Sequence, residues 1–194
     1  MKSLALVGGH ALQVPQYDEV WSLNACYRWL PKPLLRHCTR WFELHNRAWL
    51  KGNYAKSREA GKSFADHLKA LNRLGIPVYQ WKPWPEIRHA IEYPKRLVER
   101  WTPHGGYHCG SFDWMLALAI TERSFSDIGF YGVDLGPLDG EPISARPALE
   151  YWCGVAEGQG ITITTNGGSL FSTFQLVRSA RQYGYDDVEN VLDV

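Results

Sequence analysis

Short hydrophobic runs recur along the chain and are separated by glycine, proline and polar turns. The first run, residues 4–7, leads directly into Gly8 and Gly9, which is typical of a buried strand that ends in a tight turn. The run at 127–133 is mostly apolar, as expected for a central strand of a parallel sheet. Further runs rich in β-branched or aromatic residues predict strands at 19–24, 39–44, 75–79 and 161–165.

Several of the segments between these runs have the hydrophobic periodicity of helices. Residues 62–74 place apolar side chains on one face and are followed by Gly75, a residue suited to a helix C-cap. Residues 111–122 are apolar on nearly every face, which predicts a buried helix with Ser111 as its N-cap. Two further helices are predicted, at 93–101 and at 146–157.

The order of these segments predicts an α/β fold with a mainly parallel sheet of about five or six strands flanked by helices. Ligands of such sheets bind at the carboxyl ends of the strands. We expect one domain over residues 1–178, followed by a polar C-terminal tail at 179–194. The polar segment 51–61 is predicted to be a mobile loop or lid.

Composition and charge argue against several classes of function. The chain has 194 residues, of which 45% are hydrophobic and 21% charged, ordinary values for a globular protein that buries a full core. A formal net charge of +1 gives no global field that would attract nucleic acid or an anionic membrane. The four cysteines form no CxxC pair, no run approaches the ~20 apolar residues of a membrane span, and the chain enters a strand without an apolar signal. We therefore expect a reduced, cytoplasmic protein with no membrane partner.

Small and polar residues stand where the predicted strands and the buried helix meet the carboxyl edge of the sheet. Glycines allow the backbone to approach a ligand closely, and an asparagine offers both a donor and an acceptor to a base or ribose. The same residue types also serve in ordinary turns, which leaves a purely structural role open. The candidates are Gly8, Gly9 and His10 after the first strand, Asn24 at the end of the second, Gly110 and Ser111 at the buried helix, and Asp134 after the run at 127–133.

Several of these motifs recur, in the same order, in one group of Rossmann-like proteins. They are the glycine pair at 8–9, Trp-Ser-Leu-Asn at 21–24, Gly-Ser at 110–111, the Tyr-Gly-Val-Asp segment at 126–134, and the helix at 148–152 before Gly-Ile-Thr-Ile at 160–163. Over residues 3–170 the chain resembles the 6-hydroxymethylpterin diphosphokinase-like domains, the motility accessory factors and the bacterial sialyltransferases that use CMP-sugars. It is most similar to short proteins of this group encoded by bacteriophages and prophages. The resemblance implies a single Rossmann-like domain that binds a nucleotide.

The resemblance also implies roles for individual residues. In the sialyltransferases the asparagine that ends the second strand and the serine-glycine turn before the apolar helix contact CMP, and these positions match Asn24 and the turn at Gly110 and Ser111. The catalytic histidine of that family precedes the last long helix. It has no counterpart here, because no histidine follows His108.

Other ionisable residues are therefore the candidates for acid and base chemistry. His108 lies in the ligand loop, and histidine is a common general acid or base, while Asp139 and Glu141 lie closest to the position of the missing histidine. The diphosphokinase-like relatives use carboxylates and Mg²⁺ instead. Asp134, with Asp139 or Glu141, could hold such an ion.

The leading functional prediction is a nucleotide-dependent transferase for glycosyl or diphosphoryl groups, with a nucleotide or nucleotide sugar as the small-molecule ligand. A non-catalytic nucleotide-binding protein is the first alternative. A second is a single-stranded nucleic-acid binder that uses the Trp- and Arg-rich segment 27–49, which the near-neutral net charge disfavours. A zinc site that includes His104, His108 and Cys109 is a further alternative. These residues do not predict an oligomeric state.

Overall fold

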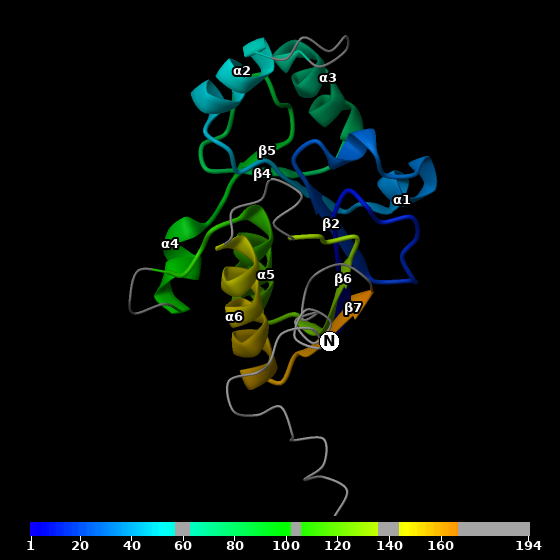
Figure 1. The fold of residues 1–194 in the computed structure, drawn as a ribbon, viewed down its shortest axis with the longest axis vertical. Coiled ribbons are helices and arrows are strands. Elements are labelled where there is room, and N and C mark those ends of the chain that lie inside the picture. The colour runs from blue at the N-terminus through cyan, green and yellow to red at the C-terminus, as the bar shows by residue number, and fades with distance from the viewer. Residues whose placement is uncertain (57–62, 102–105, 136–143, 167–194) are drawn as a thin grey trace, which may run out of the picture.

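The computed structural model describes residues 1–56, 63–101, 106–135 and 144–166. Its core is a seven-stranded sheet, all parallel, with the strand order β5-β4-β3-β2-β1-β6-β7 (Figure 1). The strands are β1 (Lys2–Val7), β2 (Glu19–Leu23), β3 (Arg40–Phe42), β4 (Val78–Gln80), β5 (Ala90–Glu92), β6 (Phe125–Tyr131) and β7 (Thr162–Asn166). The predicted α/β class is confirmed. The sheet has more strands than the expected five or six. The additional strand, β5, was not predicted because it is short and largely exposed and has no strand-like pattern in the sequence.

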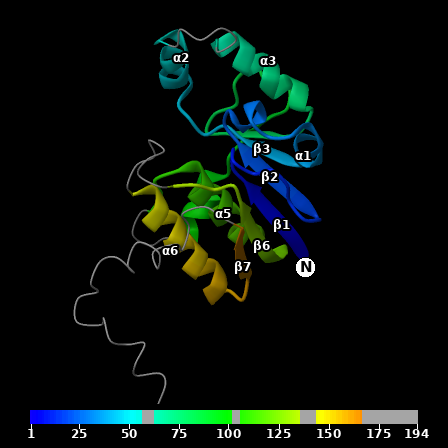
Figure 2. The same cartoon turned by 45° about the vertical axis from the view of Figure 1, so that its right-hand side comes forward.

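Helices cover the sheet in two groups. α5 and α6 lie side by side on one face of the sheet, and α2 packs against α3 beyond the β4–β5 end (Figures 1 and 2). The helices are α1 (Lys32–His37), α2 (Arg47–Lys56), α3 (Phe64–Leu74), α4 (Lys95–Val98), α5 (Ser111–Glu122) and α6 (Ala145–Gly158), with short 3-10 turns at Cys26–Arg28 and Glu99–Trp101.

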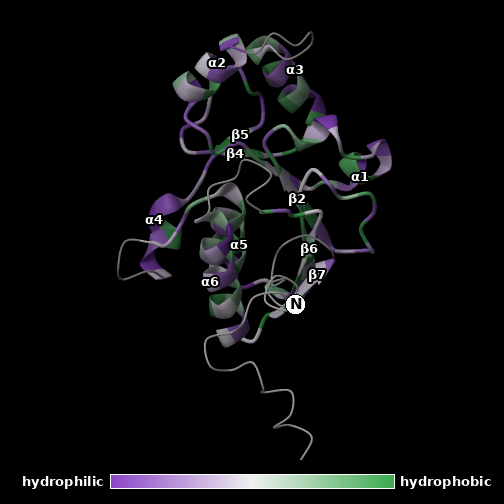
Figure 3. Cartoon of the chain, viewed as in Figure 1, coloured by the Kyte–Doolittle hydropathy of each residue, from purple (hydrophilic) through white to green (hydrophobic). Residues whose placement is uncertain are grey.

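The core is concentrated between α5, α6 and the central strands. Every residue of β2 is buried, and the last four residues of β1 are fully buried. Each residue of α5 from Met115 to Ile120 is at most 2% exposed, which confirms the prediction of a helix that is buried on nearly all faces. The short α4, much of which is hydrophilic (Figure 3), packs against α5, and its residue Val98 is buried.

One predicted loop is a helix. Residues 51–56 belong to α2, because the side chain of Asn46 accepts hydrogen bonds from the backbone N–H groups of Ala48 and Trp49 and so caps the helix, and because Leu50 is buried. The rest of the predicted lid, residues 57–61, and the predicted tail at 179–194 lie outside the described residues. All four cysteines are described, and none forms a disulfide.

The chain changes direction in the sheet between β1 and β6. From β1 it runs outward through β2, β3, β4 and β5, and it then returns through α5 to place β6 on the other side of β1. Such a switch point is where ligands of open α/β sheets bind. The loops that follow the two strands touch there, since the backbone N–H of Gly8 donates to the Tyr131 carbonyl oxygen at 2.9 Å. A side chain on Gly8 would overlap the carbonyl oxygen of Gly132, and Gly132 itself has a left-handed φ of 59°.

This backbone contact leads to a stability prediction. We expect Gly8→Ala to lower the free energy of unfolding by about 1–3 kcal/mol or more, because the added methyl group forces two backbone segments apart. The matched control is Gly154→Ala in α6, where an added Cβ meets nothing within 4 Å and should stabilise the helix by about 0.5–1 kcal/mol. Urea denaturation of the three proteins measures both effects. Wild-type stability in Gly8→Ala would contradict the tight contact of these loops.

Candidate functional site

A cleft of about 970 Å³ opens at the carboxyl edge of the sheet. Its walls come from the residues that follow β1, β2, β3 and β6 and from the first turns of α5 and α6. The structure brings together all of the predicted nucleotide-binding residues: Gly8, Gly9, His10, Asn24, Gly110, Ser111 and Asp134. His108 lines the same cleft, whereas Asp139 and Glu141 lie outside the described residues.

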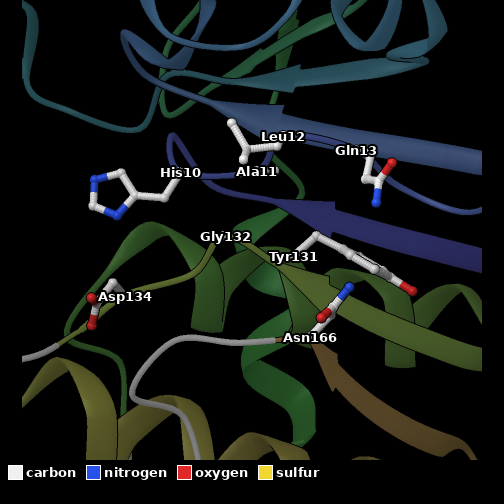
Figure 4. Close-up of a pocket in the computed structure, with 8 residues that line it drawn as sticks. All are labelled: His10, Ala11, Leu12, Gln13, Tyr131, Gly132, Asp134 and Asn166. Atoms are coloured by element: carbon white, nitrogen blue, oxygen red, sulfur yellow. The ribbon is translucent and has the colours of Figure 1, made fainter.

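A smaller cavity of about 320 Å³ adjoins the cleft and shares His10, Gly132 and Asp134 with it. His10 and Asp134 lie at one end of this cavity, and Gln13, Tyr131 and Asn166 lie at the other (Figure 4). The two spaces therefore meet at the loops of the switch point.

Asn24 has an unusual backbone and an unsatisfied side chain. Its φ is 49°, in the left-handed region that asparagine tolerates better than most residues. Two hydrogen bonds hold it there: its N–H donates to the Phe42 carbonyl at 2.8 Å, and the Trp41 indole donates to its own carbonyl at 3.1 Å. The side-chain oxygen is buried and has no hydrogen-bond partner among the described residues. Because such an atom destabilises the protein by roughly 1–3 kcal/mol, a ligand that donates to it would be favoured.

The turn before α5 differs from the prediction. Its N-cap is Gly110 rather than Ser111, because the Asp113 carboxylate reaches back and accepts from the N–H groups of Gly110 at 2.9 Å and Cys109 at 2.7 Å. Asp113 is 1% exposed. Its negative charge already occupies the positive end of the helix dipole, which disfavours a phosphate there. The turn is better suited to a neutral ribose or base.

His108, which was predicted to be a general acid or base in the ligand loop, is tightly packed. Its ring lies between Trp114, at 3.5 Å between centroids, and Trp152, at 4.7 Å. Nδ1 lies 3.2 Å from the Asp113 carboxylate, and the side chain is 3% exposed. Nε2 is buried without a partner in the described part of the chain. The catalytic role of His108 stays a prediction.

The N-terminus of α6 also faces the cleft, through Ala145 and Leu149. The first turn of this helix contains no acidic residue, so its dipole is not neutralised in the way that Asp113 neutralises α5. No lysine or arginine is found among the described residues that line the cleft. The first turn of α6 is therefore compatible with a phosphate group.

A buried polar network that the sequence did not predict lies beside the cleft. Glu43, 1% exposed, follows β3 and binds His45 Nδ1 at 2.7 Å through one oxygen and His67 Nε2 at 2.8 Å through the other. His67 in turn bonds the Tyr27 hydroxyl at 2.8 Å through Nδ1. Burial by itself would raise the pKa of Glu43, but the hydrogen bonds and charges of His45 and His67 outweigh it and hold that pKa below its ordinary value. The only signal in the sequence was a Glu-X-His spacing at the end of a strand.

The Trp- and Arg-rich segment contributes tryptophans to the core and to the cleft. Trp41 is fully buried, whereas Trp29 and Trp49 are 62% and 56% exposed and line the cleft. Arg40 pairs with Glu19 at 3.1 Å and with Glu122 at 2.5 Å, and Arg47 pairs with Glu86. These ion pairs leave less positive charge for a polyanion.

The described residues do not complete either of the predicted metal sites. They contain no group of three or more His, Cys, Asp or Glu side chains that could hold a metal ion. His104, a predicted zinc ligand, lies outside them, as do the carboxylates expected beside Asp134. The Mg²⁺ site at Asp134 stays a prediction. No helix in the described ranges is long and apolar enough to cross a membrane.

Comparison with known proteins defines the fold class. No protein-family model matches the chain, and no curated protein matches it. Among solved structures the fold is similar to that of the sialyltransferase CstII from Campylobacter jejuni, determined in complex with a substrate analogue, cytidine-5'-monophosphate. The TM-score is 0.51 at 12% identity, over 85% of this chain and 79% of that one. This confirms a Rossmann-like fold of the sialyltransferase type. The resemblance to diphosphokinase-like and bacteriophage proteins stays a prediction.

The lowered pKa of Glu43 predicts a pH-dependent contribution to stability. A carboxyl whose pKa is lower in the folded than in the unfolded protein stabilises the fold above its ordinary value of about 4.3, and this contribution is lost as the pH falls through the folded-state pKa. We expect Glu43→Gln to cost about 1–3 kcal/mol at pH 7, because the amide cannot accept from both histidines. The difference from wild type should shrink below about pH 4. Chemical denaturation across pH measures it, and a difference that stays constant from pH 7 to pH 3 would contradict the assignment.

Proposed function

We propose that the protein is a nucleotide-dependent transferase that binds a nucleotide or nucleotide sugar in the cleft at the carboxyl edge of the sheet. The observation that carries the proposal is the buried, unpartnered side-chain oxygen of Asn24, held on a left-handed backbone at the wall of this cleft. A buried oxygen without a donor destabilises the fold unless a ligand supplies one. The amino group of a base or a ribose hydroxyl would supply the missing donor.

The proposed ligand has a defined direction in the cleft. Its base and ribose lie against Asn24 and the turn at Gly110 and Ser111, where Asp113 disfavours an anion. Its phosphate points to the first turn of α6 at Ala145, which has no acidic residue to compete. Asp134 is close enough to line the same space and could contribute to a Mg²⁺ site together with the phosphate oxygens. One carboxylate does not make such a site alone, so no step of the proposal depends on the metal.

CMP is the first ligand to test, because the structural neighbour was determined with it. We expect isothermal titration calorimetry to detect CMP binding by the wild-type protein and a ten- to hundredfold weaker affinity in Asn24→Gly, equivalent to the ~1–3 kcal/mol of one buried hydrogen-bonding group. Glycine is preferred to alanine here because it keeps the left-handed backbone without strain.

The matched control is Asn53→Gly, which removes the same side chain from an exposed position in α2 away from the cleft. Its affinity for CMP should equal that of the wild-type protein. Equal affinity in Asn24→Gly would refute the assignment of the cleft residues. Binding without release of nucleotide from any nucleotide sugar, with or without Mg²⁺, would favour the non-catalytic alternative.

A further inference from the structure

Trp29 is a large aromatic residue that stays exposed although it lines the cleft. It is 62% exposed. Each of the three other tryptophans of the cleft packs on a neighbouring ring. Trp49 stacks on His45 with 5.1 Å between ring centroids, and Trp81 packs edge-on against Trp114 at 4.9 Å. Among the residues that the structure describes, Trp29 alone of these four has no aromatic ring against it, so its indole is open to a flat ligand.

The loops that follow β1 and β2 together position the Trp29 indole. The backbone N–H of Trp29 donates to the Cys26 carbonyl oxygen at 3.0 Å, which closes the 3-10 turn after β2. In the loop after β1, an added Cβ on Gly9 would lie 3.2 Å from Cε3 of the indole, closer than an ordinary van der Waals contact. Gly9 therefore leaves room for the ring, and part of the indole lies directly against the glycine pair at the switch point.

The surroundings of Trp29 favour uncharged contacts with a ligand. Trp29 belongs to the same segment after β2 as Asn24, whose buried side-chain oxygen has no donor in the described part of the chain. The described residues that line the cleft include no lysine or arginine, so a nucleotide would gain little there from ion pairs with side chains. Stacking of a base on an aromatic side chain is an uncharged contact that every base can make, because each has a flat π-face.

We infer, on the basis of the proposed function, that Trp29 is the stacking platform for the nucleobase of the ligand. One face of the base lies on the indole, while an amino group of the base or a ribose hydroxyl donates to Asn24. A ribose presents hydroxyls rather than an aromatic face, and the phosphate is directed to the first turn of α6. The base is therefore the part of the nucleotide that fits the indole. Trp29 selects for an aromatic base as a class, and Asn24 selects for a hydrogen-bond donor.

The first arm of the test compares a nucleotide with the same molecule without its base. The probes are CMP and ribose 5-phosphate, titrated by NMR into the wild-type protein, Trp29→Leu and Trp29→Phe. We expect Trp29→Leu to weaken CMP binding roughly tenfold or more, because leucine is apolar but has no ring face. Trp29→Phe should keep most of the affinity, because a phenyl ring still stacks. Binding of ribose 5-phosphate should be the same in all three proteins.

Tyr151→Leu is the matched control for the loss of an exposed ring. Tyr151 is 48% exposed on α6 and is not among the residues that line the cleft. Its replacement should leave the affinity for CMP at the wild-type value. Because Trp29 is mostly exposed, Trp29→Leu should unfold at a temperature close to that of the wild-type protein, so that weaker binding cannot be attributed to unfolding.

The second arm observes the indole directly. Protein labelled with 5-fluorotryptophan should give a ¹⁹F resonance for each of its nine tryptophans, and the resonance of Trp29 is the one missing from Trp29→Phe. We expect CMP to shift this resonance, because the base lies on the ring, and we expect ribose 5-phosphate to leave it in place. A resonance of Trp29 that does not move when CMP binds would overturn the inference.

The outcomes separate the two proposals. Binding of CMP that depends on Asn24 but is unchanged in Trp29→Leu would overturn the stacking role of Trp29 and leave the proposed function intact. An equal loss of affinity for CMP and for ribose 5-phosphate in Trp29→Leu would also overturn it, because the indole would then act on the ribose or on the shape of the cleft. Failure of the wild-type protein to bind CMP would overturn the proposed function and the stacking role with it.

Discussion

The site depends on the backbone contact between the loops that follow β1 and β6. Gly8 and Gly132 lie so close that a side chain on either would overlap the backbone of the other loop. This contact closes the sheet at the point where the chain changes direction and leaves the space for a ligand above it. These glycines are needed for packing of backbone on backbone, whether or not a ligand also approaches them.

Electrostatics divides the resulting cleft into regions with different chemistry. The Asp113 carboxylate occupies the N-terminus of α5, which makes that wall suitable for neutral hydrogen-bonding groups such as Asn24. The N-terminus of α6 has no such carboxylate and favours an anion. The third wall holds His45 on the buried Glu43, beside exposed tryptophans. The neutral and the anionic parts of a nucleotide would thus meet separate elements of the cleft under the proposed function.

The pattern of hydrophobic residues predicted the features that depend only on residues close together in the sequence. The bounds of α5 agreed residue for residue because its apolar run and flanking glycine define a buried helix without reference to the rest of the chain. The gathering of Asn24 and Gly110 at one edge followed from parallel topology alone. The pairing of Glu43 with His45 and His67 was missed, because His67 comes from α3, and only tertiary packing brings a residue 24 positions away to the carboxylate. The N-cap of α5 was missed because a carboxylate inside the first turn replaced the serine.

The proposed function requires the cleft to be a nucleotide site in which a ligand donates to the Asn24 side chain. The most direct measurement is a crystal structure of the protein grown with saturating CMP. We expect the cytosine or ribose to lie within hydrogen-bond distance of the Asn24 side chain and the Gly110–Ser111 turn, with the phosphate toward the first turn of α6. CMP ordered elsewhere on the protein, or an Asn24 side chain that still lacks a partner with CMP bound, would contradict the account.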